Sequence, residues 1–259
     1  MWEKELEKAI EAARKAREVI LEVYNRNFDV EIKEDASPVT EADKRADQLI
    51  TKVLKEAFST YAFLTEESED NKDRLTNDYV WIVDPVDGTK DFVARDGGFT
   101  TNIALAYKHE SILGVICIPV TGEIYFAVKG QGAYYLAPNK EAVRIHVNDK
   151  TQDLTVLTSV FHHSQAEKDL IEKHSDRIKH IESCGSSIKA CRIAEGKAEI
   201  SYRTSPYTKE WDTAACQIIL EEAGGLFLDP KGNPLRYNRV DVYNRDGYIM
   251  VNKKENVLW

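Results

Sequence analysis

The chain of 259 residues contains little glycine, proline or cysteine, with 13, 7 and 4 residues respectively. The low glycine and proline content and the 42% hydrophobic share argue against a disordered or low-complexity protein. No two cysteines form a Cys-x-x-Cys pair, and four scattered cysteines do not suggest a disulfide framework. The sequence therefore predicts a compact protein of a reducing compartment, and we expect a cytoplasmic location.

Long apolar runs and an excess of positive charge are also missing. No stretch approaches the roughly 20 apolar residues that a membrane-spanning helix needs. We therefore expect no transmembrane segment. The N-terminus also lacks the apolar core of a signal peptide. The chain has 35 Lys and Arg against 44 Asp and Glu, a net charge of −9, which argues against a nucleic-acid polymer as partner. A small phosphorylated substrate stays compatible, because bound cations can invert the local charge.

The chain does contain clear helical and strand patterns. Apolar residues at helical spacing predict amphipathic helices over residues 3–25 and 41–58. Other predicted elements are a charged loop at 66–78, strands at 79–83, 102–107, 112–118, 124–128, 154–159, 199–202, 226–228 and 247–252, and helices at 166–174, 185–196 and 212–223. A break in the pattern at 137–152 predicts a boundary between two lobes, residues 1–140 and 141–259.

The most informative segment is Trp81-Ile-Val-Asp-Pro-Val-Asp-Gly-Thr-Lys-Asp-Phe92. The apolar run that precedes its acids predicts a buried strand, with Asp84 and Asp87 at the carboxyl end, where α/β proteins place their chemistry. The proline between them fixes φ and the following glycine permits a tight turn, so the two carboxylates can converge. Such carboxylates repel unless a cation lies between them. A divalent metal meets that need, although taken alone the segment also suits an ordinary turn.

Further acids stand at the predicted ends of other elements, namely Asp43, Glu66 with Glu67, and Asp212. Carboxylate and carbonyl oxygens are the ligands that Mg²⁺ takes, whereas the Cys and His residues lack zinc-ligand spacing. Thr89 opens a possible helix whose first N–H groups suit a phosphate. Together these features predict metal-assisted hydrolysis of a phosphate ester.

Each acid also has a purely structural interpretation. Asp43, after Thr40, suits a helix cap and first-turn acid, and Asp212 suits the start of the helix that follows it. Glu66 and Glu67 begin a charged run that would ordinarily be solvated. The functional interpretation therefore depends on all of these residues meeting at one place.

Several motifs follow one another along the chain: Ser37-Pro-Val-Thr-Glu-Ala-Asp43, Thr65-Glu-Glu-Ser68, Asp84-Pro-Val-Asp-Gly-Thr89, Trp211-Asp-Thr-Ala-Ala215 and Glu222-Ala-Gly-Gly225. In this order they resemble the inositol monophosphatase superfamily of lithium-sensitive, Mg²⁺-dependent phosphatases. The segments Gly98-Phe-Thr-Thr-Asn-Ile-Ala-Leu105 and Gly185-Ser-Ser-Ile-Lys189 are similar to the 3′(2′),5′-bisphosphate nucleotidase branch. Inositol monophosphatases proper usually have Asn where this chain has Asp91, and they lack a lysine placed like Lys189.

The resemblance implies an α/β (α+β) fold, the layered αβαβα sandwich, with two to three Mg²⁺ ions between the lobes. It implies one ion on Glu66, Asp84 and the backbone carbonyl of Val86, a second on Asp84, Asp87 and Asp212, and a weaker third near Glu66. It also implies that Asp43 and Thr89 orient and deprotonate the attacking water. A water on the metal is already acidified, so orientation matters more than basicity.

The substrate-binding residues that the resemblance implies are Asp87, Gly88, Thr89, His162, Ser186, Ser187, Lys189, Arg203 and Asp212. Ser186, Ser187 and Lys189 would hold the nucleotide and its second phosphate. A lysine on a helix is more often a solvated surface residue, which is the structural alternative for Lys189.

The function implied is Mg²⁺-dependent hydrolysis of the 3′-phosphate of adenosine 3′,5′-bisphosphate to AMP and phosphate, with 3′-phosphoadenylyl sulfate as a second substrate. An inositol-1-phosphate or histidinol-phosphate phosphatase of the same superfamily is the alternative within enzymes. A catalytically silent metal-binding regulatory protein is the alternative of a different class. A homodimer is compatible with the resemblance.

Overall fold

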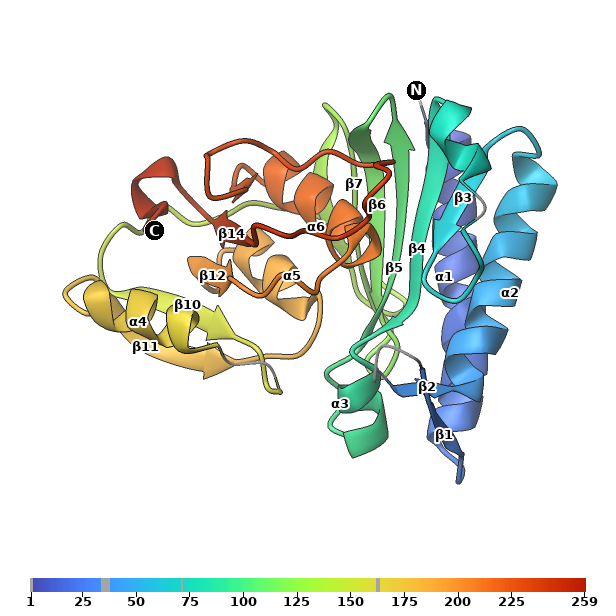
Figure 1. Cartoon of the computed structure of the whole chain (residues 1–259), viewed down its shortest axis with the longest axis horizontal. Helices are drawn as coiled ribbons and strands as arrows, with labels where there is room; N and C mark the ends of the chain where they lie inside the picture. The colour runs from blue at the N-terminus through green and yellow to red at the C-terminus, as the bar shows by residue number, and fades with distance from the viewer. Residues whose placement is uncertain (1, 34–37, 71, 162–163) are drawn as a thin grey trace.

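Helices and sheets alternate in five layers in the computed structural model, which describes residues 2–33, 38–70, 72–161 and 164–259 (Figure 1). Helices α1 (Glu3–Tyr24) and α2 (Glu41–Ala57) cover one face of a seven-stranded sheet. Helices α5 (Ile188–Ala194) and α6 (Glu210–Glu222) lie between this sheet and a five-stranded one, and α4 (Gln165–Lys173) lies on the outer side. The predicted αβαβα sandwich is confirmed.

The first sheet has the order β3–β4–β5–β6–β7–β8–β9. Its strands are β3 (Ala62–Thr65), β4 (Tyr79–Asp87), β5 (Thr100–Tyr107), β6 (Glu110–Ile118), β7 (Glu123–Val128), β8 (Gly132–Leu136) and β9 (Val143–Ile145). All neighbours are antiparallel except β3 and β4, which are parallel. The register of β4 against β5 is irregular between Asp84 and Asp87, which bends the end of β4 that carries both acids.

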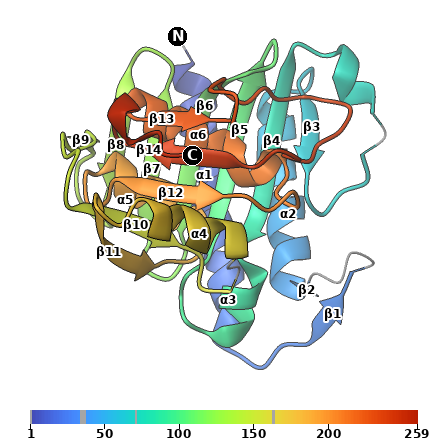
Figure 2. The ribbon, with the colours of Figure 1, turned by 60° about the vertical axis from the view of Figure 1, so that its left-hand side comes forward.

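The second sheet has the order β11–β10–β12–β14–β13, and Figure 2 shows it in front of the first. Its strands are β10 (Leu154–Thr158), β11 (Ile178–Ser183), β12 (Ile200–Arg203), β13 (Leu226–Leu228) and β14 (Tyr248–Val251). Short elements complete the described chain: β1 (Val30–Ile32), β2 (Pro38–Thr40), α3 (Thr89–Ala94) and the 3₁₀ turns η1 (Asp73–Thr76) and η2 (Lys254–Asn256). In the described ranges no helix is both long and apolar enough to cross a lipid bilayer.

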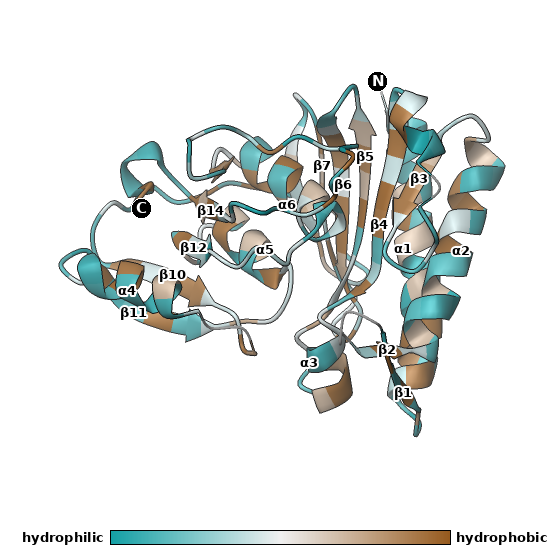
Figure 3. Cartoon of the chain, viewed as in Figure 1, coloured by the Kyte–Doolittle hydropathy of each residue, from teal (hydrophilic) through white to brown (hydrophobic). Residues whose placement is uncertain are grey.

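Helix α6 packs in the core between the two sheets. Its residues Ala214, Ile218 and Leu220 are buried in the core between the sheets, whereas α1 and α2 close a separate core on the other face of the first sheet. Figure 3 shows the apolar faces of α1 and α2 turned toward that sheet. Because buried apolar area stabilises the fold by about 25 cal/mol per Å², the position of α6 is set by the global core.

Three local expectations need correction. The helix predicted to start at residue 185 begins at Ile188, because Ser186 has a left-handed φ of 42° that no helix tolerates. The loop predicted at 66–78 contains η1. Strands β1, β2, β3, β8, β9 and β11 are not among the predicted strands. Strand β11 is an edge strand with only Ile178 buried, so it lacks the apolar run of a core strand. The division of the chain at residue 140 stays a prediction, and β9 lies in the first sheet.

We predict that Gly114→Ala lowers the free energy of unfolding by about 1–3 kcal/mol through overpacking. A Cβ at Gly114, in β6, would lie 2.6 Å from Cγ2 of Ile218 and 2.8 Å from the carbonyl oxygen of Ala215, both in α6. Urea denaturation measures the loss. The control is Gly130→Asn, where nothing lies within 4 Å and Asn tolerates the φ of 77°. An equal loss in both variants would contradict the close packing of α6.

Candidate active site

A cavity of about 410 Å³ lies where the end of β4 faces the start of α6 and the loop before α5. The predicted site residues that line it are Glu66, Asp84, Val86, Asp87, Gly88, Thr89, Ser186, Ser187, Lys189, Arg203 and Asp212. Asp43 contacts this set through Thr89, and His162 lies outside the described residues. Side chains separated by up to about two thirds of the chain are therefore gathered around one space.

Three carboxylates form the centre of the cavity. Ligand oxygens of Asp84, Asp87 and Asp212 lie within 4.8 Å of one another. Asp84 and Asp87 stand at the bent end of β4, and Asp212 is in the first turn of α6. Its Oδ2 accepts a hydrogen bond of 2.6 Å from the backbone N–H of Lys209, so Asp212 also caps the helix. Asp212 therefore both caps α6 and belongs to the acidic cluster.

Burial and mutual repulsion oppose ionisation of this cluster. Burial, and then the charges of Glu66 and Asp87, raise the pKa of Asp84 well above its usual range. Burial and the charge of Asp87 raise the pKa of Asp212 to about 7. Hard oxygen donors held this close in a buried place fit a divalent cation such as Mg²⁺, which would offset the repulsion. The chemistry of the donor set therefore agrees with the implied metal.

Glu66 lines the same cavity, but its carboxylate also pairs with a lysine. The Nζ of Lys33 lies 3.0 Å from Oε1 of Glu66 and bonds Glu67 as well. Burial raises the pKa of Glu67 to about 7 although Lys33 opposes that shift. Glu66 is thus not simply part of a solvated run, and its role as a metal ligand stays a prediction.

Asp43 and Thr89 are in contact, as the motif comparison implied. Asp43 is 1% exposed, and its Oδ2 accepts hydrogen bonds from the N–H and hydroxyl of Thr40 at 2.8 and 2.7 Å. Its other oxygen, Oδ1, lies 3.3 Å from the hydroxyl of Thr89, which is also 3.3 Å from the carbonyl of Val86. Burial raises the pKa of Asp43, and the bonds from Thr40 oppose that shift. The helix cap thus fixes Asp43 and leaves one oxygen for Thr89.

Lys189 contributes positive charge to the wall of the cavity. Its Nζ donates to the carbonyl oxygens of Cys184 and Ser186 at 3.1 and 2.7 Å. Burial lowers its pKa. Because both carbonyls belong to the loop before α5, Lys189 ties that loop together while it lines the cavity with Arg203. The solvated-surface interpretation of Lys189 does not hold.

An aromatic rim around the cavity was not predicted. It consists of Tyr207, Trp211, Tyr243 and Tyr248. Tyr207 is 74% exposed, and the Nζ of Lys209 lies 5.1 Å from the ring centre of Trp211 and 5.5 Å from that of Tyr243. The position of Tyr207 close to the Trp-Asp motif could have indicated it from the sequence. No local sequence pattern indicates Tyr243.

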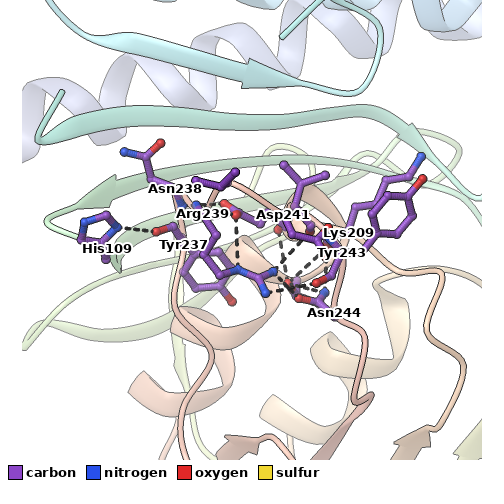
Figure 4. Close-up of polar contacts among 12 residues, drawn as sticks. His109, Lys209, Tyr237, Asn238, Arg239, Asp241, Tyr243 and Asn244 are labelled. Atoms are coloured by element: carbon purple, nitrogen blue, oxygen red, sulfur yellow. Dashed lines mark hydrogen bonds and ion pairs between the residues drawn. The ribbon is translucent and has the colours of Figure 1, made fainter. Parts of the chain in front are cut away.

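Tyr243 is held at the rim by a network that Figure 4 shows. The buried carboxylate of Glu210, in the first turn of α6, accepts backbone hydrogen bonds from Asn238 and Arg239 at 2.6 and 2.8 Å. The guanidinium of Arg239 donates to the carbonyl of Tyr243 at 3.1 Å and to Oδ1 of Asn244 at 2.7 Å. The segment before β14 is therefore fixed to the same helix turn that carries Asp212.

Asp91 also lines the cavity, and its carboxylate is unsatisfied. The side chain is 6% exposed, and its Oδ1 has no hydrogen-bond partner among the described residues. Burial, and then the charges of Asp96 and Asp87, raise the pKa of Asp91 to about 7, although the charge of Lys189 opposes the shift. A buried, unpaired oxygen of this kind costs stability when it is charged.

Comparison with known proteins identifies one family. The model of the inositol monophosphatase family matches residues 1–257. Proteins named 3′(2′),5′-bisphosphate nucleotidase CysQ are 34% identical to the chain, over 95% of it and 91% of the relative from Aggregatibacter actinomycetemcomitans, and over 94% and 98% for Escherichia coli K12. Inositol monophosphatase 2 of Solanum lycopersicum is 31% identical over 87% of each chain.

A solved structure agrees with these sequence matches. CysQ from Bacteroides thetaiotaomicron, described as a bacterial member of the inositol monophosphatase family, has a TM-score of 0.84 and 35% identity, covering 98% of this chain and 99% of its own. The chain therefore belongs to the inositol monophosphatase family and is an enzyme of the phosphatase class. The resemblance inferred from its motifs is confirmed.

We predict that Asp91→Asn stabilises the protein in a pH-dependent way. The raised pKa of Asp91 means that the unfolded chain, with an ordinary value near 4, loses its proton first, so the wild-type contribution falls as pH rises from about 4 to 7. The variant should gain nothing near pH 4 and on the order of 2 kcal/mol at pH 8. Urea denaturation across this range tests it, with the exposed Asp176→Asn as control. A gain independent of pH would contradict the assignment.

Proposed function

We propose that the chain is a Mg²⁺-dependent phosphatase that transfers the 3′-phosphoryl group of adenosine 3′,5′-bisphosphate to water, giving AMP and phosphate. In the same proposal, 3′-phosphoadenylyl sulfate is a second substrate. The observation that carries it is the cluster of Asp84, Asp87 and Asp212 in one cavity with the Asp43–Thr89 pair. Relatives named 3′(2′),5′-bisphosphate nucleotidase support this substrate choice.

In this proposal the carboxylates of Asp84, Asp87 and Asp212 hold the metal, together with Glu66 and the carbonyl of Val86. A divalent cation bound there supplies Lewis-acid activation of a water and neutralises charge on the phosphoryl oxygens. Lys33 keeps Glu66 oriented toward the cavity through its 3.0 Å bond. Two or three Mg²⁺ ions per site belong to the proposal.

Asp43 and Thr89 orient the nucleophile. The Thr89 hydroxyl donates to Oδ1 of Asp43, so its lone pairs face away from that carboxylate and accept a hydrogen bond from the attacking water. The water oxygen bonds to phosphorus as the 3′ ester bond breaks, and the proton passes through Thr89 to Asp43. The ester oxygen leaves and takes up a proton from solvent. The burial of Asp43 favours its protonated form after this transfer.

The remaining wall of the cavity suits a nucleotide. In this proposal Lys189 and Arg203, which line the cavity, bind the second phosphate, and the rings of Tyr207 and Tyr243 offer flat surfaces on which a base can stack. Inositol 1-phosphate has no base, so this rim favours the nucleotide over the inositol alternative. A silent regulatory protein is disfavoured, because the whole catalytic set, including Asp43 and Thr89, is present.

Phosphate release from a substrate panel tests the proposal. With Mg²⁺, we expect turnover of adenosine 3′,5′-bisphosphate at a kcat/KM about tenfold or more above that of inositol 1-phosphate and histidinol phosphate, since a specifically contacted group adds at least 1–3 kcal/mol of discrimination. Asp87→Asn should abolish release while the fold is kept, which excludes a contaminating phosphatase. Family resemblance also predicts inhibition by Li⁺. Faster turnover of inositol 1-phosphate would overturn the substrate assignment.

We predict that Tyr207→Ala raises KM for adenosine 3′,5′-bisphosphate about 5- to 150-fold, because stacking of one base on an aromatic ring contributes about 1–3 kcal/mol. The kinetics with inositol 1-phosphate should not change, since that substrate lacks a base. Tyr207→Phe is the matched control: it keeps the ring and should keep KM within about twofold. An equal loss with both substrates would show that Tyr207 supports the cavity without contacting a base.

A further inference from the structure

We propose that Asn102 is a positioning residue that, together with Ser187, fixes the Asp87 carboxylate for the divalent cation. The inference rests on the metal site of the proposed function and adds a residue that neither the motifs nor the chemistry above employs. Asn102 lies in the Gly98–Leu105 segment, whose sequence marks a branch of the family without suggesting a role.

The three side chains form a closed triangle of hydrogen bonds. The Ser187 hydroxyl donates to Oδ2 of Asp87 at 2.7 Å, and Nδ2 of Asn102 lies 3.2 Å from the same oxygen. The Asn102 amide also donates to Oγ of Ser187 at 2.8 Å. This arrangement is consistent, because the amide has two hydrogens and the hydroxyl can accept one bond while it donates another.

The orientation of the Asn102 amide is itself determined by a neighbour. Thr100 Oγ1 donates to Oδ1 of Asn102 at 3.0 Å, which leaves the Nδ2 group facing Asp87. Asn102, Thr100 and Ser187 are 1%, 0% and 4% exposed, so water does not compete for these bonds. A buried and fully consistent network of this kind holds one geometry.

The network determines which oxygen of Asp87 is available to a cation. Ser187 and Asn102 donate to Oδ2, and Oγ1 of Thr100 lies 3.4 Å from the same oxygen. Among the described residues the hydrogen bonds to this carboxylate therefore fall on Oδ2, which leaves Oδ1 for a cation. Asn102 is also the β5 partner of Asp84 in the sheet register, so it stands directly beside both acids of β4. Partners of metal ligands that act in this way typically change metal affinity about 10- to 100-fold when they are removed.

The triangle also links the first sheet to the loop before α5. Asp87 and Asn102 belong to the first sheet, whereas Ser187 precedes α5. Ser187 can reach Asp87 because Gly185 passes the backbone of Gly98 so closely that an added Cβ would lie 2.0 Å from the Gly98 carbonyl oxygen. The affinity of the metal site should therefore depend on the contact between the first sheet and the loop before α5.

Binding of Mn²⁺ to the metal-stripped protein, without substrate, tests the inference. Titration followed by the electron paramagnetic resonance of free Mn²⁺ should give a Kd about 10- to 100-fold higher for Asn102→Ala than for wild type. The matched control is Asn252→Ala, since Asn252 is also fully buried and its Nδ2 bonds Asn148 and Lys150 away from the cavity. Both variants should melt at a lower temperature, but only Asn102→Ala should bind Mn²⁺ more weakly.

A second pair of variants keeps the test decisive if Asn102→Ala does not fold. Ser187→Ala should weaken Mn²⁺ binding, whereas Ser201→Ala, which removes a buried hydroxyl bonded to the Leu157 carbonyl, should not. Unchanged Mn²⁺ affinity in a folded Asn102→Ala or Ser187→Ala variant would overturn the inference and leave the metal site intact. Absence of Mn²⁺ binding to the wild-type protein would instead overturn the metal site, and the inference with it.

Discussion

Repulsion among buried carboxylates is the constraint on which the site depends. Asp84, Asp87 and Asp212 come together because β4 and α6 are fixed by cores that have nothing to do with their charge. The energy that brings them together comes from apolar burial, and the price is a cluster that resists ionisation in the absence of a cation. The arrangement is suited to a hard divalent ion, which would offset the repulsion among the carboxylates.

Two residues of the candidate site lie at the starts of helices. Asp43 accepts the backbone N–H of Thr40 at the start of α2, and Asp212 accepts that of Lys209 at the start of α6. In both cases one carboxylate oxygen stabilises the helix, while the residue also contacts Thr89 (Asp43) or belongs to the acidic cluster (Asp212). Substitution by alanine at either position would remove the cap and the carboxylate that lies at the candidate site together, whereas asparagine keeps an acceptor for the cap. The choice of substitution therefore decides which of the two roles an experiment measures.

Local sequence patterns predicted the parts of the fold in which one chain segment carries its own signal. The apolar run before Asp84 and the turn residues after it correctly placed the end of β4, and the helical spacing around Ile20 and Ile50 correctly indicated α1 and α2. Strand β11 escaped prediction because an exposed edge strand needs no apolar face. The start of α5 was misplaced because the backbone of Ser186 is set by its neighbours in space.

The same distinction applies to the site. The acids and Thr89 could be chosen as candidate site residues from the sequence, because each lies in a contiguous motif. The sequence did not indicate a role for Asn102, because its proposed role depends on Ser187, 85 residues away. It did not indicate Tyr243 either, because Tyr243 is positioned by Arg239, which also contacts Glu210. Contacts of this kind have no local pattern, because each partner taken alone is an ordinary polar residue.

The burial of α6 between two sheets has a consequence for how the enzyme fails. Active sites built on mobile loops often lose catalysis before the rest of the protein melts, because the loops open first. Here Asp212 stands in the first turn of α6, which with α5 packs between the two sheets, so α6 cannot withdraw without exposing the core between them to water. Inactivation by heat should therefore coincide with loss of the core between the two sheets.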